Sequence, residues 1–415
     1  MLALSVVAAR ALDPESFAQF LAFVALAIMA SGLWDVGVSS LLTREVASGR
    51  IGVRESLRQA ARIRGRSLPL WIGAFVVGSV VAGALAPLEP ASVALFAVAS
   101  LAMGTRMVLA AALQGILAFR AVGLTLATGR IVTALAATPA LGVDDEESTF
   151  IILAGAVTLG EVLAVVLAAL SLTRLSGRTG GRDAPSTCAR LSLRASAPFA
   201  ANAFMATVYN RLDILLVAAL TTSVQTAAYA PASRVQDALL IVPGSIGVVA
   251  FPMVARRWTS TPEAVGRLVV RLATVGLAIA LPLAICVFMF APSLLRVVLG
   301  EDYVAAAEPV RILVWSLPLT ALAAPLLAGL AGVGRAADTT KVFGVALATA
   351  LVMHLSLDWW WGATGAAVAT LSRDPAALVL AVYLAWRAGL LGQRQGVGAV
   401  SATSARPPAS REGVL

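Results

Sequence analysis

Residues 44–86 have the sequence REVASGRIGVRESLRQAARIRGRSLPLWIGAFVVGSVVAGALA, in which seven arginines within 23 positions precede 20 residues without a charge. An apolar stretch of about 20 residues can cross a bilayer as an α-helix, and cations clustered beside it stay on the cytoplasmic side. This unit recurs, because 23 of the 31 cations lie in every second gap between apolar stretches. The other gaps hold only two cations, Arg10 and Arg296, but 11 of the 22 acids. The alternation predicts a multi-pass membrane protein with both termini in the cytoplasm.

The composition agrees with this prediction and excludes other classes. Of the 415 residues, 59% are hydrophobic, and the mean hydropathy is +0.89, which is far from an ordinary soluble domain. The pI near 10.8 follows from cations that bracket apolar stretches, so we expect no nucleic-acid partner. The two cysteines, Cys188 and Cys286, fall in a predicted loop and a predicted span. We therefore expect neither a disulfide nor a metal site.

The apolar stretches predict eleven complete membrane spans. The fragment Met1–Ala9 is apolar but too short to cross, and we expect it to be the outer end of a first helix that begins upstream of this start. With that truncated helix the prediction is twelve helices. The eleven spans are 17–42, 67–86, 91–117, 122–142, 149–172, 195–220, 228–253, 268–291, 306–330, 340–357 and 362–386.

A polar segment divides the spans into two equal sets. Residues 174–194 are rich in Gly, Ser and Arg and have no apolar period, as a cytoplasmic linker would. The predicted domains are a six-helix bundle at 1–173, a second at 195–388, and a disordered cytoplasmic tail at 389–415. Six helices in each half keep the halves parallel, and parallel repeats around a central cavity are a transporter architecture. The fold class is thus an all-α integral membrane protein of two six-helix bundles.

Several short motifs resemble one family in the same order along the chain. They are Ala9–Phe17, Asp35–Gly37 with Arg44–Glu45, Tyr209–Asp213 with Tyr229–Arg234, Phe251–Pro252, Leu299–Tyr303 and Trp361–Thr370. Together they resemble bacterial polysaccharide (O-antigen, Wzx-type) flippases of the multidrug/oligosaccharidyl-lipid/polysaccharide superfamily.

The resemblance implies a MATE-like fold with a central cavity, in the bacterial cytoplasmic membrane. It implies alternating-access movement of an undecaprenyl-diphosphate-linked oligosaccharide from the inner to the outer leaflet, for cell-surface polysaccharide. It also implies membrane lipids as neighbours and a glycan polymerase or glycosyltransferases as partners. No catalytic residue and no cofactor is implied beyond coupling to H⁺ or Na⁺.

Six arginines lie inside the apolar stretches, where a charge is costly and usually functional. Two of them, Arg106 and Arg130, are predicted near the bilayer midplane at the depth of Glu161. The surplus of one cation suits an anionic ligand, because guanidinium forks fit diphosphate oxygens. The alternative is structural, with both arginines paired to Glu161 to tie helices together.

A second set of charges is predicted in the outer half of the second bundle. It comprises Arg211, Asp213, Arg234 and Asp237, two cations and two anions, and this balance favours a structural network. The competing interpretation is a coupling site in which an aspartate takes up a proton or Na⁺.

Three further polar residues lie inside predicted spans. Asp35 lies toward the inner end of its span, where it is either a gate or a helix cap, and we favour the cap. His354, the single histidine, is expected to be hydrogen-bonded structurally rather than to relay protons. Arg373 is expected to pair with Asp374 or to extend toward the interface.

Three rival functions remain open at the level of sequence. A lipid II flippase and a cation-coupled multidrug exporter belong to the same superfamily, although an arginine-bearing cavity suits amphipathic cations poorly. A membrane-embedded glycan polymerase or glycosyltransferase would need convergent acids or bases. No paired carboxylates of that kind stand out, so we expect no enzymatic activity.

Overall fold

The computed structural model describes residues 2–12, 14–83, 90–143, 145–178, 191–210, 212–298 and 301–391, and every regular element in these ranges is a helix. Seven helices there are long and apolar enough to cross a membrane, or eight if one bent pair is counted as a span. The chain is therefore a multi-pass membrane protein with the predicted all-α fold.

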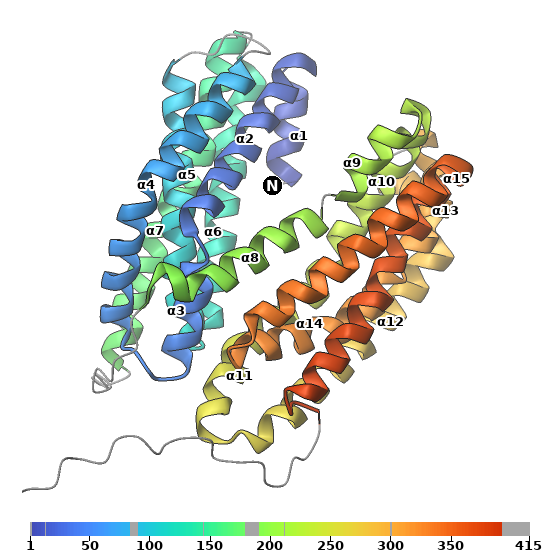
Figure 1. Ribbon diagram of the computed structural model, residues 1–415. Coiled ribbons are helices and arrows are strands. Elements are labelled where there is room, and N and C mark those ends of the chain that lie inside the picture. The colour runs from blue at the N-terminus through green and yellow to red at the C-terminus, as the bar shows by residue number, and fades with distance from the viewer. Residues whose placement is uncertain are drawn as a thin grey trace, which may run out of the picture.

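The first bundle packs around α5 and α7, which lie against each other and against α3 and α6 (Figure 1). Its core contains interlocking aromatic rings of Phe20, Phe23, Phe96 and Phe150, with ring centroids 5.5 to 6.2 Å apart. The elements are α1 (Leu2–Ala11), α2 (Pro14–Asp35), α3 (Val38–Ala47), α4 (Val53–Gly83), α5 (Pro90–Gly115), α6 (Phe119–Ala137), η1 (Thr138–Gly142) and α7 (Glu146–Arg178).

The second bundle packs around α14, which contacts α11, α12 and α15. The helix α8 runs from the first bundle across to the second and lies along α15 (Figure 1). The elements are α8 (Leu193–Tyr209), α9 (Leu212–Leu220), α10 (Ser223–Leu239), α11 (Ile241–Ser260), α12 (Glu263–Val298), η2 (Glu301–Ala306), α13 (Ala307–Leu313), α14 (Ser316–Gly332) and α15 (Ala336–Arg387).

Each predicted span is largely helical, but some boundaries were wrong, and the spans 17–42 and 306–330 are interrupted by turns at residues 36–37 and 314–315. The segment 53–66, assigned to a loop, is the first part of α4. It is amphipathic there, since Arg54, Arg58 and Arg62 are exposed while Ala60 and Ile63 are buried. The predicted spans 195–220 and 228–253 are each divided, at Asn210 and at Leu240.

The predicted linker and tail are shorter than expected. The helix α7 continues to Arg178, so residues 174–178 are helical, and residues 179–190 lie outside the described ranges. Leu390 is only 1% exposed and packs into the core beside Val269, so the residues just after α15 belong to the second bundle. The tail prediction for 392–415 lies outside the described residues.

The long helix α15 contains the last two predicted spans, divided at Gly362. This glycine has φ 52° and ψ −131°, a conformation open to residues without a Cβ. The Gln225 side chain of α10 accepts a hydrogen bond from the Ala363 amide at 2.8 Å, which satisfies the first free donor after the break. The motif Trp361–Thr370 resembles the start of the family's last helix, and the backbone of α15 is broken at the same place.

The two bundles meet at one end, which we call the cationic end because it carries the arginines of α3, α4, α11 and α12. There α3 packs on α8 and α11, and the Thr259 hydroxyl donates to the Ser48 carbonyl at 3.5 Å. A Cβ on Gly334 would lie 2.5 Å from an Arg44 guanidinium nitrogen, which places that side chain of the first bundle against the α14–α15 turn. Away from this end the bundles diverge (Figure 1).

The backbone of α8 lies directly against Gly37. This residue joins α2 to α3, which are bent by 53°, and it has φ 74°. A Cβ there would lie 2.7 Å from the Ser196 carbonyl oxygen and 2.9 Å from the Phe199 carbonyl carbon, and closer still to the Ala200 nitrogen. Only glycine fits this contact. The preceding Val36 also has a positive φ of 42°, so the joint is strained.

Candidate functional site

A carboxylate shared by two guanidinium groups lies inside the first bundle. The Arg106 Nε–H donates to Glu161 Oε2 at 2.8 Å, and Arg130 Nη1 lies 3.2 Å from Glu161 Oε1. Glu161 is nearly buried, with 4% of its side chain exposed, against 15% for Arg106 and 33% for Arg130. The structure thus brings together, from α5, α6 and α7, the three charges that the sequence placed in one layer. We call them the arginine cluster.

Two glycines position the arginine cluster. Gly129 and Gly160, which directly precede Arg130 and Glu161, lie where α6 packs on α7. A Cβ on Gly129 would lie 2.8 Å from the Gly160 carbonyl oxygen, and one on Gly160 would overlap the Thr133 hydroxyl. Small residues at such a contact let helix backbones approach closely. The approach brings Arg130 within ion-pair distance of Glu161.

The arginine cluster carries a net charge of +1 at a depth where charge is expensive. Within these three side chains the one carboxylate offsets one guanidinium, so their formal charges sum to +1. A charge at mid-bilayer costs about 2.5–3.5 kcal/mol unless a counter-charge or water offsets it. The ion pairs also connect the helices, so the geometry contains the structural role together with the capacity to bind an anion.

The second bundle buries a continuous series of hydrogen-bonded groups, which we call the buried polar chain. Asp213 Oδ2 accepts from the Tyr229 hydroxyl at 2.9 Å, and that hydroxyl lies 2.8 Å from Thr370 Oγ1. Thr370 Oγ1 lies 3.3 Å from His354 Nε2, and His354 Nδ1 lies 2.8 Å from Asp358 Oδ2. All five side chains are buried, and they come from α9, α10 and both parts of α15.

The direction of donation along the buried polar chain depends on the tautomer of His354, because the hydroxyls of Tyr229 and Thr370 can each donate or accept a hydrogen bond. His354 is hydrogen-bonded at both ring nitrogens, as the sequence-based interpretation expected, and its partners are Thr370 and Asp358.

A buried ion pair lies beside this chain. Arg373 is 3% exposed, donates from Nη1 to the Tyr209 carbonyl at 2.5 Å, and has its Nε 3.8 Å from Asp374 Oδ1. The Tyr209 hydroxyl donates to Asp374, and the Arg373 guanidinium carbon lies 4.1 Å from the Tyr209 ring centroid. Arg373 also interacts electrostatically with Asp213. The pairing with Asp374 is as predicted, but the group is buried rather than extended toward the interface.

The described members of the predicted four-residue charge network, Asp213, Arg234 and Asp237, differ in burial. Asp213 faces Tyr229 in the core, whereas Arg234 pairs with Asp237 at 3.4 Å with 67% and 40% of their side chains exposed. Arg211 lies outside the described residues. The separation follows from helix geometry, because α10 directs Tyr229 inward and Arg234, five residues later, outward.

Asp35 is placed as a helix cap. It ends α2, and its carboxylate accepts from the Ser39 amide at 3.2 Å and from the Ser39 hydroxyl at 2.5 Å. These bonds satisfy a donor in the first turn of α3, which is the capping role that the sequence favoured. The gate role stays a prediction, although Asp35 is two residues from the glycine at the contact between the bundles.

Arg64 is a buried charge that sequence reasoning missed, since we counted it among the loop cations. It is 5% exposed, its guanidinium carbon lies 3.5 Å from the Trp34 ring centroid, and Nη1 donates to the Gly104 carbonyl at 3.0 Å. The signal was its spacing, because Arg64 shares the helix face of Ala60, Ile63 and Ser67 and not that of Arg62.

Metal binding receives no support from the part of the chain that the structure describes. There, no three or more His, Cys, Asp or Glu side chains are grouped as they would be to hold a metal ion.

Comparisons with known proteins identify the fold. The sequence profile described as MatE matches residues 198–360, and no curated protein sequence matches the chain. The fold is that of MATE transporters. A structure of MATE in the bent conformation superposes with a TM-score of 0.72 at 16% identity, over 94% of this chain and 91% of that one. The Vibrio cholerae MATE transporter VcmN in the bent form has a TM-score of 0.67 at 15% identity, covering 94% and 92%. An outward-facing multidrug resistance MATE family transporter of the MOP superfamily has 0.67 at 16%, covering 94% and 93%.

Proposed function

We propose that this chain, built on the MATE transporter fold, moves an undecaprenyl-diphosphate-linked oligosaccharide from the inner to the outer leaflet by alternating access. The observation that carries the proposal is the arginine cluster, in which two guanidiniums share one carboxylate inside the membrane-spanning part. A diphosphate would be attracted by the two guanidiniums and could accept bidentate hydrogen bonds from their forks. An amphipathic cation would be repelled by the same guanidiniums.

We propose that the hydrophilic part of such a substrate passes between the two bundles. The bundles are in contact at the cationic end and diverge away from it, and α9 and α10 form the edge of the second bundle that faces the first (Figure 1). Arg234 of α10 is 67% exposed within a predicted span. An exposed guanidinium at that depth is stable beside water and costly beside lipid tails, which favours an aqueous space between the bundles.

The position of the cationic end indicates how the protein is oriented in the cell membrane. Cationic loops remain cytoplasmic, so the contact between the bundles would close the cytoplasmic side and the divergence would open the outer side. The end of α15 would then be cytoplasmic (Figure 1). Glycosyltransferases that assemble the lipid-linked glycan inside, and a polymerase that extends it outside, are the partners that this direction of transport requires.

The buried polar chain is our candidate for coupling transport to protons. Its two carboxylates, Asp213 and Asp358, are joined through hydroxyl and imidazole groups that can donate or accept a proton by hydrogen bonds. Movement of a proton along this series would change the hydrogen bonds that join α9, α10 and α15 and thereby their packing. We prefer H⁺ to Na⁺ because the groups already satisfy one another by hydrogen bonds.

The test replaces Arg106 and Arg130 together by glutamine in a host whose surface glycan depends on this protein. We expect surface glycan to fall at least tenfold at unchanged protein abundance. The control replaces Arg54 and Arg58, two exposed arginines of α4, by glutamine and should export normally. Normal export by the Arg106/Arg130 variant at normal abundance would refute the assignment. A loss explained entirely by lower abundance would show that the cluster only ties helices together.

A cation-coupled multidrug exporter is the second candidate, favoured by the similarity to a multidrug resistance MATE transporter. Proteoliposomes separate the two candidates, because one preparation can be offered a fluorescent cationic dye or a fluorescent undecaprenyl-diphosphate-linked sugar. Dye movement that survives loss of both arginines, without sugar-lipid movement, would favour export of drugs. Competition by lipid II in the same assay would identify the peptidoglycan precursor as the substrate.

A further inference from the structure

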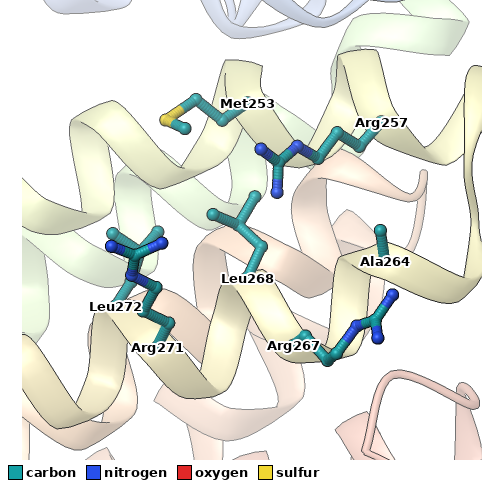
Figure 2. A pocket seen from close by; sticks show the side chains of 7 residues that line it. All are labelled: Met253, Arg257, Ala264, Arg267, Leu268, Arg271 and Leu272. Atoms are coloured by element: carbon teal, nitrogen blue, oxygen red, sulfur yellow. The ribbon is translucent and has the colours of Figure 1, made fainter.

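A half-open pocket of about 390 Å³ lies between α11 and α12 at the cationic end, on a different bundle from the arginine cluster. Its lining combines three arginines with four apolar side chains that come from both helices (Figure 2). The lining residues are Met253, Arg257, Ala264, Arg267, Leu268, Arg271 and Leu272.

Helix periodicity places these residues around one hollow. Met253 and Arg257 are four residues apart on α11, and Leu268 and Leu272 are four apart on α12, so each pair shares a face. Leu268 is 6% exposed and packs into the core of the second bundle, which makes it the base of the pocket. Figure 2 shows Arg257 and Arg271 extending from the two helices toward the space around Leu268.

Within the described ranges, none of Arg257, Arg267 and Arg271 forms an ion pair, whereas other cations of this end do, such as Arg335 with Asp338 at 2.6 Å. The retention of loop cations in the cytoplasm explains their presence near a membrane surface. It does not explain why Arg257 and Arg271 extend from two helices toward one apolar hollow (Figure 2).

We propose that this pocket binds the headgroup phosphate of an anionic phospholipid from the cytoplasmic leaflet. The three guanidiniums would surround the phosphodiester, and an acyl chain would lie along Met253, Leu268 and Leu272 toward the bilayer interior. Basic pockets between membrane helices on the cytoplasmic side have the chemistry that such headgroups require. A soluble phosphate would satisfy the arginines but would leave the apolar side chains exposed. The bound lipid would join α11 to α12 and stabilise the second bundle.

The experiment measures lipid binding by native mass spectrometry and the unfolding temperature of the purified protein. Phosphatidylglycerol, phosphatidylcholine and inorganic diphosphate are the three probes. We expect phosphatidylglycerol to bind and to raise the unfolding temperature, and the other two to do neither. Replacing Arg257, Arg267 and Arg271 by glutamine should weaken phosphatidylglycerol binding on the order of 100-fold, since each cation near an anionic lipid contributes about fivefold.

The matched control removes the same charge elsewhere on the same end. Arg54, Arg58 and Arg62 are exposed on one face of α4, so their triple glutamine variant alters the net charge equally without touching the pocket. We expect this variant to bind phosphatidylglycerol within twofold of the unmodified protein. Equal losses in the two variants would mean general attraction to the membrane and would overturn the proposal. Unchanged binding by the pocket variant, or binding of diphosphate as tight as that of the lipid, would also overturn it. Because these measurements involve no transport, they stand whatever the transported substrate is.

Discussion

Replacing Gly37 by alanine should hinder closure of the two bundles at the cationic end. The new Cβ would lie 2.7 Å from the Ser196 carbonyl oxygen and 2.9 Å from the Phe199 carbonyl carbon. Both atoms belong to the backbone of α8, so no side-chain rotation relieves the overlap. Overpacking of this kind costs about 1–3 kcal/mol, which corresponds to about a 5- to 150-fold shift away from the closed state.

Backbone strain must be separated from this effect, because alanine at a φ of 74° is itself unfavourable by about 1–2 kcal/mol. Gly389 provides the control. It has a φ of 76°, and a Cβ there would meet nothing within 4 Å. Gly389→Ala should therefore show the strain without the overlap. The two variants should lower the unfolding temperature by similar amounts if strain alone acts.

Closure can be measured by cross-linking Ser48 to Thr259, which touch across the two bundles. In a background with Cys188→Ser and Cys286→Ser, the changes Ser48→Cys and Thr259→Cys allow an intramolecular disulfide to be followed by mass spectrometry. We expect Gly37→Ala to slow cross-linking at least fivefold and to reduce transport, and Gly389→Ala to change neither by more than twofold. Equal cross-linking rates in the two variants would refute the claim that this contact closes the cationic end.

Four other substitutions test separate parts of the molecule. Gly362→Ala should lower the free energy of unfolding by about 1–3 kcal/mol, because its Cβ would displace the Gln225 carboxamide that caps Ala363. Thermal unfolding in detergent measures this loss. An unchanged unfolding midpoint would contradict the capping role. Arg373→Leu should lower the free energy of unfolding by about 3–5 kcal/mol, because Asp374 would lose its buried counter-charge. The same thermal unfolding assay measures this loss. An unchanged stability would mean that Asp374 does not depend on Arg373. Tyr229→Phe interrupts the buried polar chain by removing the hydroxyl that contacts Asp213 and Thr370. We expect substrate binding to be unchanged and the acceleration of transport by a pH gradient to be abolished. Preserved acceleration would show that the buried polar chain does not couple transport to protons. Arg234→Gln should change stability by less than about 0.5 kcal/mol, because the side chain is exposed and its ion pair with Asp237 lies in contact with solvent. A large loss of folded protein would show a structural role instead.

The sequence predicted the fold well because hydropathy and loop charge are one-dimensional properties that membrane insertion itself uses. The charged layer of the first bundle could also be predicted, because Arg106, Arg130 and Glu161 lie on helices whose length follows from the sequence. Arg64 and Asp213 were misplaced for a different reason. Depth along a helix is fixed by residue number, but the partner of a side chain is fixed by the rotation of the helix and by its neighbours. Asp213 was grouped with Arg234 by depth, whereas helix rotation pairs it with Tyr229.

Non-local contacts account for the remaining differences. The pairing of His354 with Thr370 depends on the reversal of α15 at Gly362, where one residue with a left-handed conformation brings the two halves together. The pocket between α11 and α12 depends on the turn at Thr261, which brings arginines from two helices to one hollow. Neither arrangement follows from composition or period, because each requires knowing which two helix faces meet.

The two bundles bury excess charge of opposite sign, and this difference leads to a further prediction about the proposed mechanism. The arginine cluster carries a surplus cation, while the three carboxylates around the buried polar chain exceed Arg373 by two. A bound diphosphate would offset the first and protons would offset the second, so the protein with both ligands carries the least uncompensated charge within the membrane. If movement of the bundles is easiest in that state, Asp213→Asn, which removes one of the three carboxylates, should speed downhill movement of a sugar-lipid probe in the absence of a pH gradient. Proteoliposomes with equal pH on both sides measure this rate, and a rate in the Asp213→Asn variant equal to that of the unmodified protein would exclude the aspartate as the coupling group.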